Sequence, residues 1–274
     1  MLRNINIEEV EFTIFDTETT GLEPRSGDRI IEIAGIRFKG KERIATFQTL
    51  VNTKRPISPA ASAVNHITAD MLKDAPAIEK IMPDFLKFIQ GSCLCSYNAP
   101  FDLEFLANEL KLLGNSLPPD LITVDILSMA RRLLPNLECY ALWFVAKALG
   151  IETEQKHRAL GDVELTWEAF NRLKNILDAK GIKDYTNFLG LFAVNSRFVS
   201  DIHNQKIAQI QEAMDLGVKL KIKYISRSSE ISEREIIPKE IKQERSTVYL
   251  IGYCCLKNDE RIFRIDGILH LEIL

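Results

Sequence analysis

Three apolar, strand-like runs followed by alternating helical and strand-like segments limit the possible folds of this chain most strongly. The runs occupy residues 10–16, 29–38 and 42–51, and a basic, glycine-containing turn at 39–41 joins the second run to the third. Beyond them, segments with helical periodicity and short apolar segments alternate up to about residue 180. This order predicts an α/β domain in which helices flank the faces of a mixed sheet.

The helices and strands of this first part can be placed from the residues at their ends. Gly114, Gly150 and Gly181 each suit the position just after a helix, and Pro83 suits a first helical turn. Proline and serine residues indicate a loop at 55–72. We expect strands at 92–98 and 121–125, and helices at about 83–90, 101–114, 126–133, 138–150 and 159–181.

A change of character after residue 181 indicates a second domain. Residues 182–204 have no sustained periodicity, which predicts a semi-ordered connector. A short helix at 205–217 then leads into a strand at 218–226, where apolar residues alternate with lysines. Further strands are expected at 247–255, 261–266 and 268–274, which suggests a small β-barrel. The predicted division is a domain at 1–180, a connector at 181–204 and a barrel domain at 205–274.

Composition narrows the functional classes without choosing among them. The 274 residues include 46% hydrophobic and 27% charged residues, which is ordinary for a globular protein. With a formal net charge of −3, nucleic-acid binding needs a local basic patch rather than bulk charge. There is no signal pattern, no apolar run near about 18 residues, and no C-x-x-C pair among the five cysteines. We expect a cytoplasmic protein without membrane contact, in a reducing compartment.

Carboxylates gather where the predicted strands end. Asp16 and Glu18 are two residues apart, so on an extended chain their side chains point the same way. Asp102 follows the strand at 92–98, at the start of a helix, where helix capping is an alternative role. Asp162 lies in the first turn of the longest helix, and His157 lies in the loop before it. These groups can converge at one end of the sheet.

Such a cluster is unfavourable unless cations lie among the carboxylates. Mg²⁺ and Mn²⁺ prefer oxygen ligands of this kind, and two of them support in-line displacement at phosphorus. His157 is suited to take the proton from an attacking water. The residues therefore predict a phosphodiester hydrolase with two divalent cations, Mg²⁺ or Mn²⁺.

Three ordered motifs resemble a known family. "FDTETTGL", "NAPFD" and "HRALGD" match the D-x-E, N-x-x-F-D and H-x-A-x-x-D motifs of the DEDD superfamily of 3′–5′ exonucleases. The branch with a catalytic histidine includes the epsilon subunit of bacterial DNA polymerase III and ribonuclease T. The resemblance covers about residues 8–178 and implies a ribonuclease-H-like fold. It also implies that Asp16, Glu18, Asp102 and Asp162 bind the metals and that His157 is the general base.

The same resemblance implies a set of substrate contacts. Backbone groups of Thr19 and Gly21 would approach the terminal nucleotide, and Leu22 and Phe101 would wedge or stack on bases. For Leu22 and Phe101 the alternative is ordinary core packing. His66 would contact the terminal nucleotide, and Asn98 would support the site. Tyr97 departs from the family, where a histidine often precedes the asparagine, and so does the Asn65–His66 pair.

The last 70 or so residues are similar to a WYL domain. "LKIKYIS", "REIIPKEI", "VYLIGYCC" and "ERIFRIDGI" carry this resemblance over about residues 205–274, with Val248 in place of the name-giving tryptophan. The resemblance implies a small SH3- or Sm-like barrel that senses a ligand or nucleic acid. The alternatives are core packing for the aromatic residues and a structural Arg264–Asp266 pair. The candidate ligand residues are Tyr224, Tyr249, Tyr253, Arg261, Phe263 and Arg264.

These observations predict a metal-dependent 3′–5′ exonuclease that acts on single-stranded DNA 3′ ends, with a WYL domain that binds nucleic acid or a nucleotide. One alternative is an exoribonuclease with the same mechanism, because sequence alone hardly distinguishes the two sugars. Another is a non-catalytic sensor that keeps the nuclease fold as a scaffold. The complete set of carboxylates together with His157 argues against the sensor. The sequence does not indicate an oligomeric state.

Overall fold

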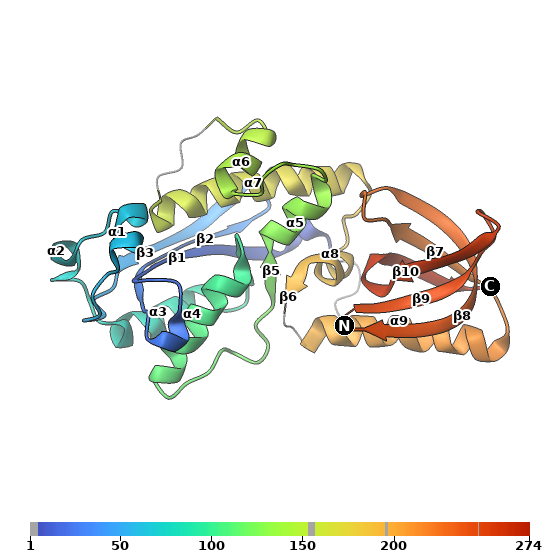
Figure 1. The fold of residues 1–274 in the computed structure, drawn as a ribbon, viewed down its shortest axis with the longest axis horizontal. Helices are drawn as coiled ribbons and strands as arrows, with labels where there is room; N and C mark the ends of the chain where they lie inside the picture. Colours follow the sequence, from blue (N-terminus) through green and yellow to red (C-terminus); the bar gives the residue numbers. More distant parts are fainter. Residues whose placement is uncertain (1–4, 153–156, 195–196, 246) are drawn as a thin grey trace.

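A computed structural model describes residues 5–152, 157–194, 197–245 and 247–274 (Figure 1). The first sheet has the strand order β3-β2-β1-β4-β5-β6. Pairing is antiparallel between β1, β2 and β3, parallel from β1 through β4 to β5, and antiparallel again between β5 and β6. The predicted mixed sheet is therefore confirmed. Its strands are β1 Glu11–Thr19, β2 Ile30–Lys39, β3 Glu42–Leu50, β4 Cys93–Ser96, β5 Thr123–Asp125 and β6 Ala193–Val194.

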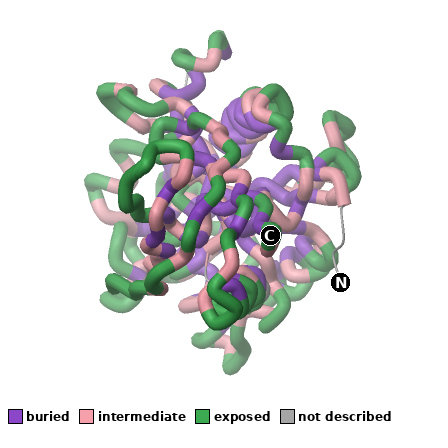
Figure 2. Tube along the Cα trace, turned by 90° about the vertical axis from the view of Figure 1, so that its right-hand side faces the viewer, coloured by how far each residue is buried: buried purple, intermediate pink, exposed green. Residues whose placement is uncertain are grey.

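Helices pack on both faces of this sheet because the side chains of β1 alternate between two cores. Phe12 and Ile14 face a cluster with Phe170 of α7, whereas Phe15 faces a cluster with Phe85 of α3. Helix α7 crosses β1 and β2 on one face, and α3 and α4 lie on the other (Figure 1). Figure 2 shows buried residues gathered in the interior. The helices are α3 Ile78–Ile89, α4 Ala99–Leu112, α5 Ile126–Leu133, α6 Leu142–Ala148 and α7 Ala159–Ala179.

Two local predictions in this domain were wrong. The stretch 55–72, expected as a loop, contains α1 Pro59–Asn65 and α2 Ala69–Leu72, each with a serine or threonine cap at its start. Pro83 lies inside α3 rather than in its first turn. The strong amphipathic stripe of α3, which buries Ile81, Met82 and Phe85, outweighs the proline. The described residues also include three short 3-10 helices, η1 Ile7–Glu9, η2 Pro24–Ser26 and η3 Ile265–Gly267.

The region expected as a semi-ordered connector is regular structure over most of its described residues. It contains α8 Tyr185–Phe192, strand β6, and the start of α9 Arg197–Leu216. Phe188, Leu189 and Phe192 are buried in the same core as Phe12, which explains why the segment is ordered. Sequence periodicity missed it because α8 is apolar on several sides and only two turns long.

The C-terminal sheet is antiparallel and open, in the order β10-β9-β8-β7-β11. The expected closed barrel is not found, since no pairing joins β10 to β11 among the described residues. Strand β8 was not predicted, because Pro238 interrupts its pattern at a register shift. The SH3- or Sm-like class stays a prediction. The strands are β7 Leu220–Ile225, β8 Ile231–Glu244, β9 Thr247–Cys254, β10 Asp259–Arg264 and β11 Ile268–Ile273.

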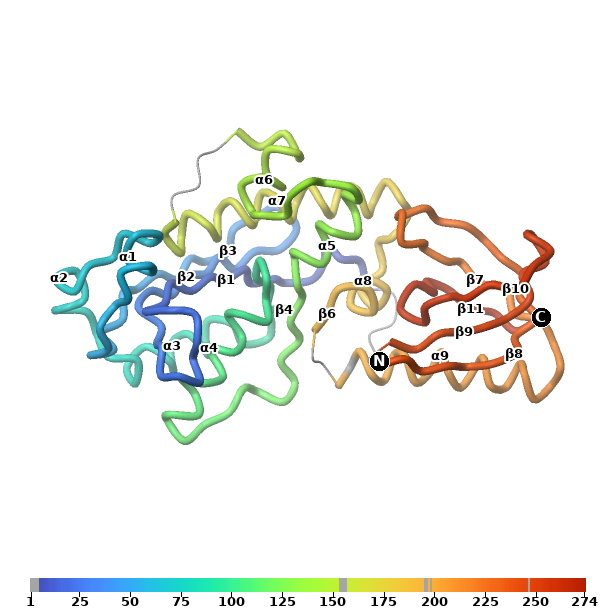
Figure 3. Tube along the Cα trace, in the orientation of Figure 1, coloured from blue at the N-terminus to red at the C-terminus, as the bar shows by residue number. Residues whose placement is uncertain are grey.

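The turn between β7 and β8 docks on the first domain. Lys180 Nζ donates to Ser229 O at 2.7 Å, and Arg132 Nη2 donates to Ile225 O at 3.3 Å. Ser229 Oγ also donates to Arg132 O. Ile225 and Leu269 belong to the buried cluster of the first domain, so the C-terminal sheet shares a core with α8. The trace places the C-terminal region beside α8 (Figure 3). The predicted domain boundaries themselves stay a prediction.

Within the described residues, no helix combines the length and the apolar character needed to cross a membrane.

Candidate active site

Three of the four predicted metal ligands meet at one end of the first sheet. Asp16 and Glu18 lie near the end of β1 and point to one side, while the intervening Thr17 is buried on the other. Asp162 lies in the first turn of α7. One carboxylate oxygen from each of these three residues lies within 4.8 Å of the other two. The arrangement expected from the strand ends is therefore present for these three groups.

Asp102 lies beside this group, held by hydrogen bonds. Thr17 donates to its Oδ1 through both the backbone nitrogen, at 3.0 Å, and Oγ1, at 2.7 Å. Ser96 Oγ donates to its Oδ2 at 2.5 Å. These bonds come from β1 and from the end of β4, so they fix the carboxylate relative to both strands. The side chain is buried, and its negative charge raises the pKa of Asp16.

The electrostatics of the cluster favour the uptake of positive charge. Burial raises the pKa of Asp16 well above its ordinary value, and the charges of Asp102, Glu18 and Asp162 raise it further. Burial, followed by Asp162 and Glu32, raises the pKa of Glu18 to about 8. Burial also raises the pKa of Asp102 to about 6, although the hydrogen bonds from Ser96 and Thr17 oppose the shift. Divalent cations bound to these oxygens would remove this repulsion, so the donor set fits Mg²⁺ or Mn²⁺.

A fifth carboxylate, Glu32, lies beside the cluster and was missed by sequence reasoning. It is fully buried on β2, directly opposite Glu18 in the β1–β2 register. Arg158 binds it with two hydrogen bonds, Nε to Oε2 at 2.9 Å and Nη2 to Oε1 at 2.8 Å. Burial alone would raise the pKa of Glu32, but the bonds from Arg158, Gln48 and Ala159 outweigh burial and lower it. A lone glutamate inside the apolar run at 29–38 was the available sequence signal.

His157 is half-buried and directly precedes the Arg158 N-cap of α7. Its φ of 46° places it in the left-handed region, which is uncommon outside glycine. His157 and Asp162 therefore both lie at the N-terminal end of α7.

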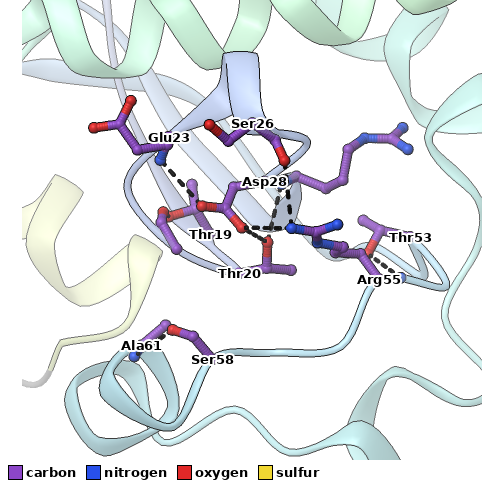
Figure 4. Close-up of polar contacts among 11 residues, drawn as sticks. Thr19, Thr20, Glu23, Ser26, Asp28, Thr53, Arg55, Ser58 and Ala61 are labelled. Carbon is purple, nitrogen blue, oxygen red and sulfur yellow. Dashed lines mark hydrogen bonds and ion pairs between the residues drawn. The ribbon is translucent and has the colours of Figure 1, made fainter.

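The loop after β1 is organised by Asp28. Its carboxylate accepts hydrogen bonds from Thr20 Oγ1 at 3.0 Å and from Glu23 N at 3.1 Å, and it lies 3.8 Å from Arg55 Nη2 (Figure 4). A Cβ on Gly21 would come within 2.3 Å of Asp28 Oδ2, so the loop requires glycine there. Thr19 Oγ1 donates to Gly21 O at 2.6 Å. The loop leaves the Leu22 side chain 75% exposed, so core packing does not explain this leucine.

The remaining predicted substrate residues lie at different depths. His66 is exposed, with a left-handed φ of 57° at the end of α1, and Asn98 is exposed before α4 with a φ of 69°. Phe101 is half-buried, and its ring centroid lies 5.0 Å from that of Phe105, so the packing alternative holds for part of this residue. Asn65, unassigned by sequence reasoning, is buried and donates to Thr19 O at 3.4 Å. A further bond from Asn65 to Glu18 lowers the pKa of Glu18.

The six WYL candidates do not form one site. Tyr249 and Arg264 line a cavity of about 500 Å³ together with Arg227 and Lys242. Arg264 is also paired with Asp266, Nε to Oδ1 at 3.0 Å, as the structural alternative supposed.

Arg261 and Phe263 line a second cavity of about 550 Å³, to which the first domain contributes Lys180. Tyr224 lines both cavities, and Tyr253 lines neither. The Tyr224 and Phe263 rings pack edge to face, with centroids 5.1 Å apart.

The mixed sheet with helices on both faces is a ribonuclease-H-like fold, and the acidic cluster at one end of it is the arrangement expected of a DEDD nuclease. The sequence model of the Exonuclease family matches residues 13–170, and that of the WYL domain matches residues 205–273. The chain therefore belongs to the Exonuclease family and carries a C-terminal WYL domain.

Known proteins agree with this assignment. The DNA polymerase III subunit epsilon of Treponema pallidum is 42% identical over 168 residues, which cover 61% of this chain and 77% of that protein. A DNA polymerase III subunit epsilon-like protein of Rhodobacter capsulatus is 38% identical over 201 residues, 72% of this chain but only 28% of that relative. The fold is similar to that of the nuclease domain of 3′hExo, a DEDDh family member bound to rAMP, with a TM-score of 0.54 and 18% sequence identity. The match covers 66% of this chain and 97% of that domain's chain.

Proposed function

We propose that this chain removes nucleotides from the 3′ end of single-stranded DNA, as a 3′–5′ exonuclease with two divalent cations. The convergence of Asp16, Glu18 and Asp162 within 4.8 Å supports this most directly. Asp102 would complete the ligand set. Mg²⁺ or Mn²⁺ held by these oxygens would neutralise the cluster and stabilise charge on the attacking and leaving oxygens.

In this proposal each residue around the acidic cluster has a separate role. His157 accepts the proton of the attacking water, because imidazole exchanges protons near neutral pH. Backbone groups of Thr19 and Gly21 face the terminal nucleotide, and the exposed Leu22 wedges against its base. His66 and Asn98 contact or support the nucleotide from α1 and from the start of α4, and Phe101 offers its half-exposed ring.

We also propose that the C-terminal domain binds a nucleotide or a nucleic-acid segment. The cavity at the domain junction supports this, because Lys180, Arg234, Lys257 and Arg261 outnumber its one carboxylate, Glu230. Tyr224 and Phe263 add aromatic surface beside those charges. Phosphate recognition by forked guanidinium groups combined with stacking is a common way to bind nucleotides. The cytoplasmic location stays a prediction.

A digestion experiment tests the nuclease. Single strands labelled at the 5′ end, DNA and RNA in parallel, are incubated with Mg²⁺ or Mn²⁺ and, separately, with a chelator. A ladder that shortens from the 3′ end in DNA, depends on the metal and disappears in Asp16→Ala is expected. A faster ladder on RNA would assign the exoribonuclease, and no ladder on either strand would favour the sensor.

A further inference from the structure

The helix that carries Asp162 has no cap of its own. Arg158 is the N-cap residue of α7, and its side chain makes no capping hydrogen bond. The first turn of a helix leaves backbone N–H groups without intrahelical partners, and a nearby carboxylate stabilises them. Glu32 on β2 supplies that carboxylate, because Ala159 N donates to its Oε2 at 3.2 Å. The helix is therefore capped by a strand 127 residues away in the sequence.

The Glu32 carboxylate also binds Arg158, the residue that follows His157. Arg158 donates two hydrogen bonds to Glu32, and Gln48 Nε2 of β3 donates a further one at 3.1 Å. Glu32 thus accepts four bonds from three residues while fully buried. A carboxylate with that many partners in fixed positions has little freedom to move. Arg158 and Ala159 follow His157 directly, so the backbone on one side of His157 is tied to the sheet.

We propose that Glu32 and Arg158 are positioning residues that fix His157 for its role as general base. This inference rests on the exonuclease function proposed above. Glu32 lies opposite Glu18 on the neighbouring strand, so β2 sets the distance between His157 and the strand that carries Asp16 and Glu18. Arg158 also pairs the charge of this fifth carboxylate, which lies beside the proposed metal ligands.

A second buried pair in the same domain provides a matched control. Glu109 on α4 is also fully buried, and Arg29 binds it with two hydrogen bonds, Nε to Oε1 at 2.8 Å and Nη2 to Oε2 at 2.6 Å. A backbone nitrogen, that of Ile30, donates to Glu109 Oε1 at 3.1 Å, as Ala159 N does to Glu32. The two pairs match in chemistry and burial, but neither Arg29 nor Glu109 adjoins His157 in the chain.

The test compares Glu32→Gln and Arg158→Lys with Glu109→Gln and Arg29→Lys in the full-length protein. We expect kcat for strand digestion to fall about 10- to 100-fold in Glu32→Gln, as for other residues that orient a catalytic group. Arg158→Lys keeps the charge and should lose less. KM should change less than about twofold, and so should the Mn²⁺ concentration for half-maximal rate when it is measured above pH 8, where Glu18 is ionised. The control variants should lose similar stability in urea unfolding but keep kcat within about twofold.

A double variant separates positioning from general loosening of the fold. In a His157→Ala background, Glu32→Gln should lower single-turnover rates by less than about twofold, because the group it positions is gone. An undiminished loss in that background, or an unchanged kcat in Glu32→Gln, would overturn the inference. If Glu32→Gln does not fold, Arg158→Lys carries the same comparison. An inactive wild-type protein would instead refute the proposed function itself.

Discussion

The charged side chains of the two sheets are arranged in opposite ways. At the end of the first sheet, burial and neighbouring carboxylates raise the pKa of Asp16 and Glu18. On the C-terminal sheet, acidic and basic side chains are interleaved as exposed pairs. Those pairs are Lys219–Glu235, Lys221–Glu233 and Lys239–Glu260. Buried like charges cost stability and are kept where chemistry needs them, whereas exposed opposite pairs contribute little. The difference indicates which sheet holds the reaction.

The largest effect is expected where the carboxylates are crowded. Asp16→Asn should lower the digestion rate by about 10³-fold or more, because a proposed metal ligand is lost. The same change should stabilise the metal-free protein by about 1 kcal/mol at pH 8. The raised pKa means that the folded state holds more protons than the unfolded state, so ionisation destabilises the fold as pH rises. Urea unfolding in chelator measures this, and a less stable Asp16→Asn would contradict the account of the cluster.

The next effect is a coupling between protons and metal. Because the pKa of Glu18 is about 8 without metal, a proton must leave before a cation binds at lower pH. The Mg²⁺ concentration for half-maximal rate should therefore fall up to about tenfold per pH unit between pH 6 and 8. Above pH 8 it should level off. Digestion rates measured against Mg²⁺ at each pH test this, and a flat dependence would mean that Glu18 is not protonated.

A smaller effect is expected from a half-buried lysine of the C-terminal region. Burial lowers the pKa of Lys206 on α9 from 10.5 to about 8, and its Nζ donates to Ile268 O. Between pH 8 and 10.5 the unfolded state binds more protons, so stability rises with pH in this window. Relative to Lys206→Met, the wild type should gain about 1 kcal/mol across it. Unfolding curves of both proteins at pH 7.5 and 10 measure the difference, which vanishes if Lys206 stays charged throughout.

The smallest effect is expected at an exposed pair. Lys221→Ala removes the ion pair with Glu233, whose nitrogen and oxygen lie 3.3 Å apart on exposed side chains. The free energy of unfolding should change by less than about 0.5 kcal/mol, and even less in 0.5 M salt. Thermal unfolding at two salt concentrations gives the answer. A larger change would mean that the charges of the second sheet do more than keep its surface hydrated.

Short-range sequence patterns were enough to predict several strands, one helix and two of the carboxylates. Strands β1 to β3 coincide with the three apolar runs of the sequence, and α5 occupies the predicted residues 126–133. Asp16 and Glu18 were recognisable because two residues of one strand share a face. Strand β8 was missed because Pro238 at its register shift imitates a loop, and α8 because an apolar two-turn helix shows no clear stripe.

The sequence by itself determined the order of strands, helices and carboxylates, since these depend on neighbours a few residues apart. The tertiary structure decided what those groups touch. Glu32 meets Arg158 across 126 residues, and Lys180 meets Ser229 across 49. It also decided that the C-terminal sheet stays open and shares a core with α8. Contacts of this kind depend on how whole elements pack, and short-range periodicity contains no information about that packing.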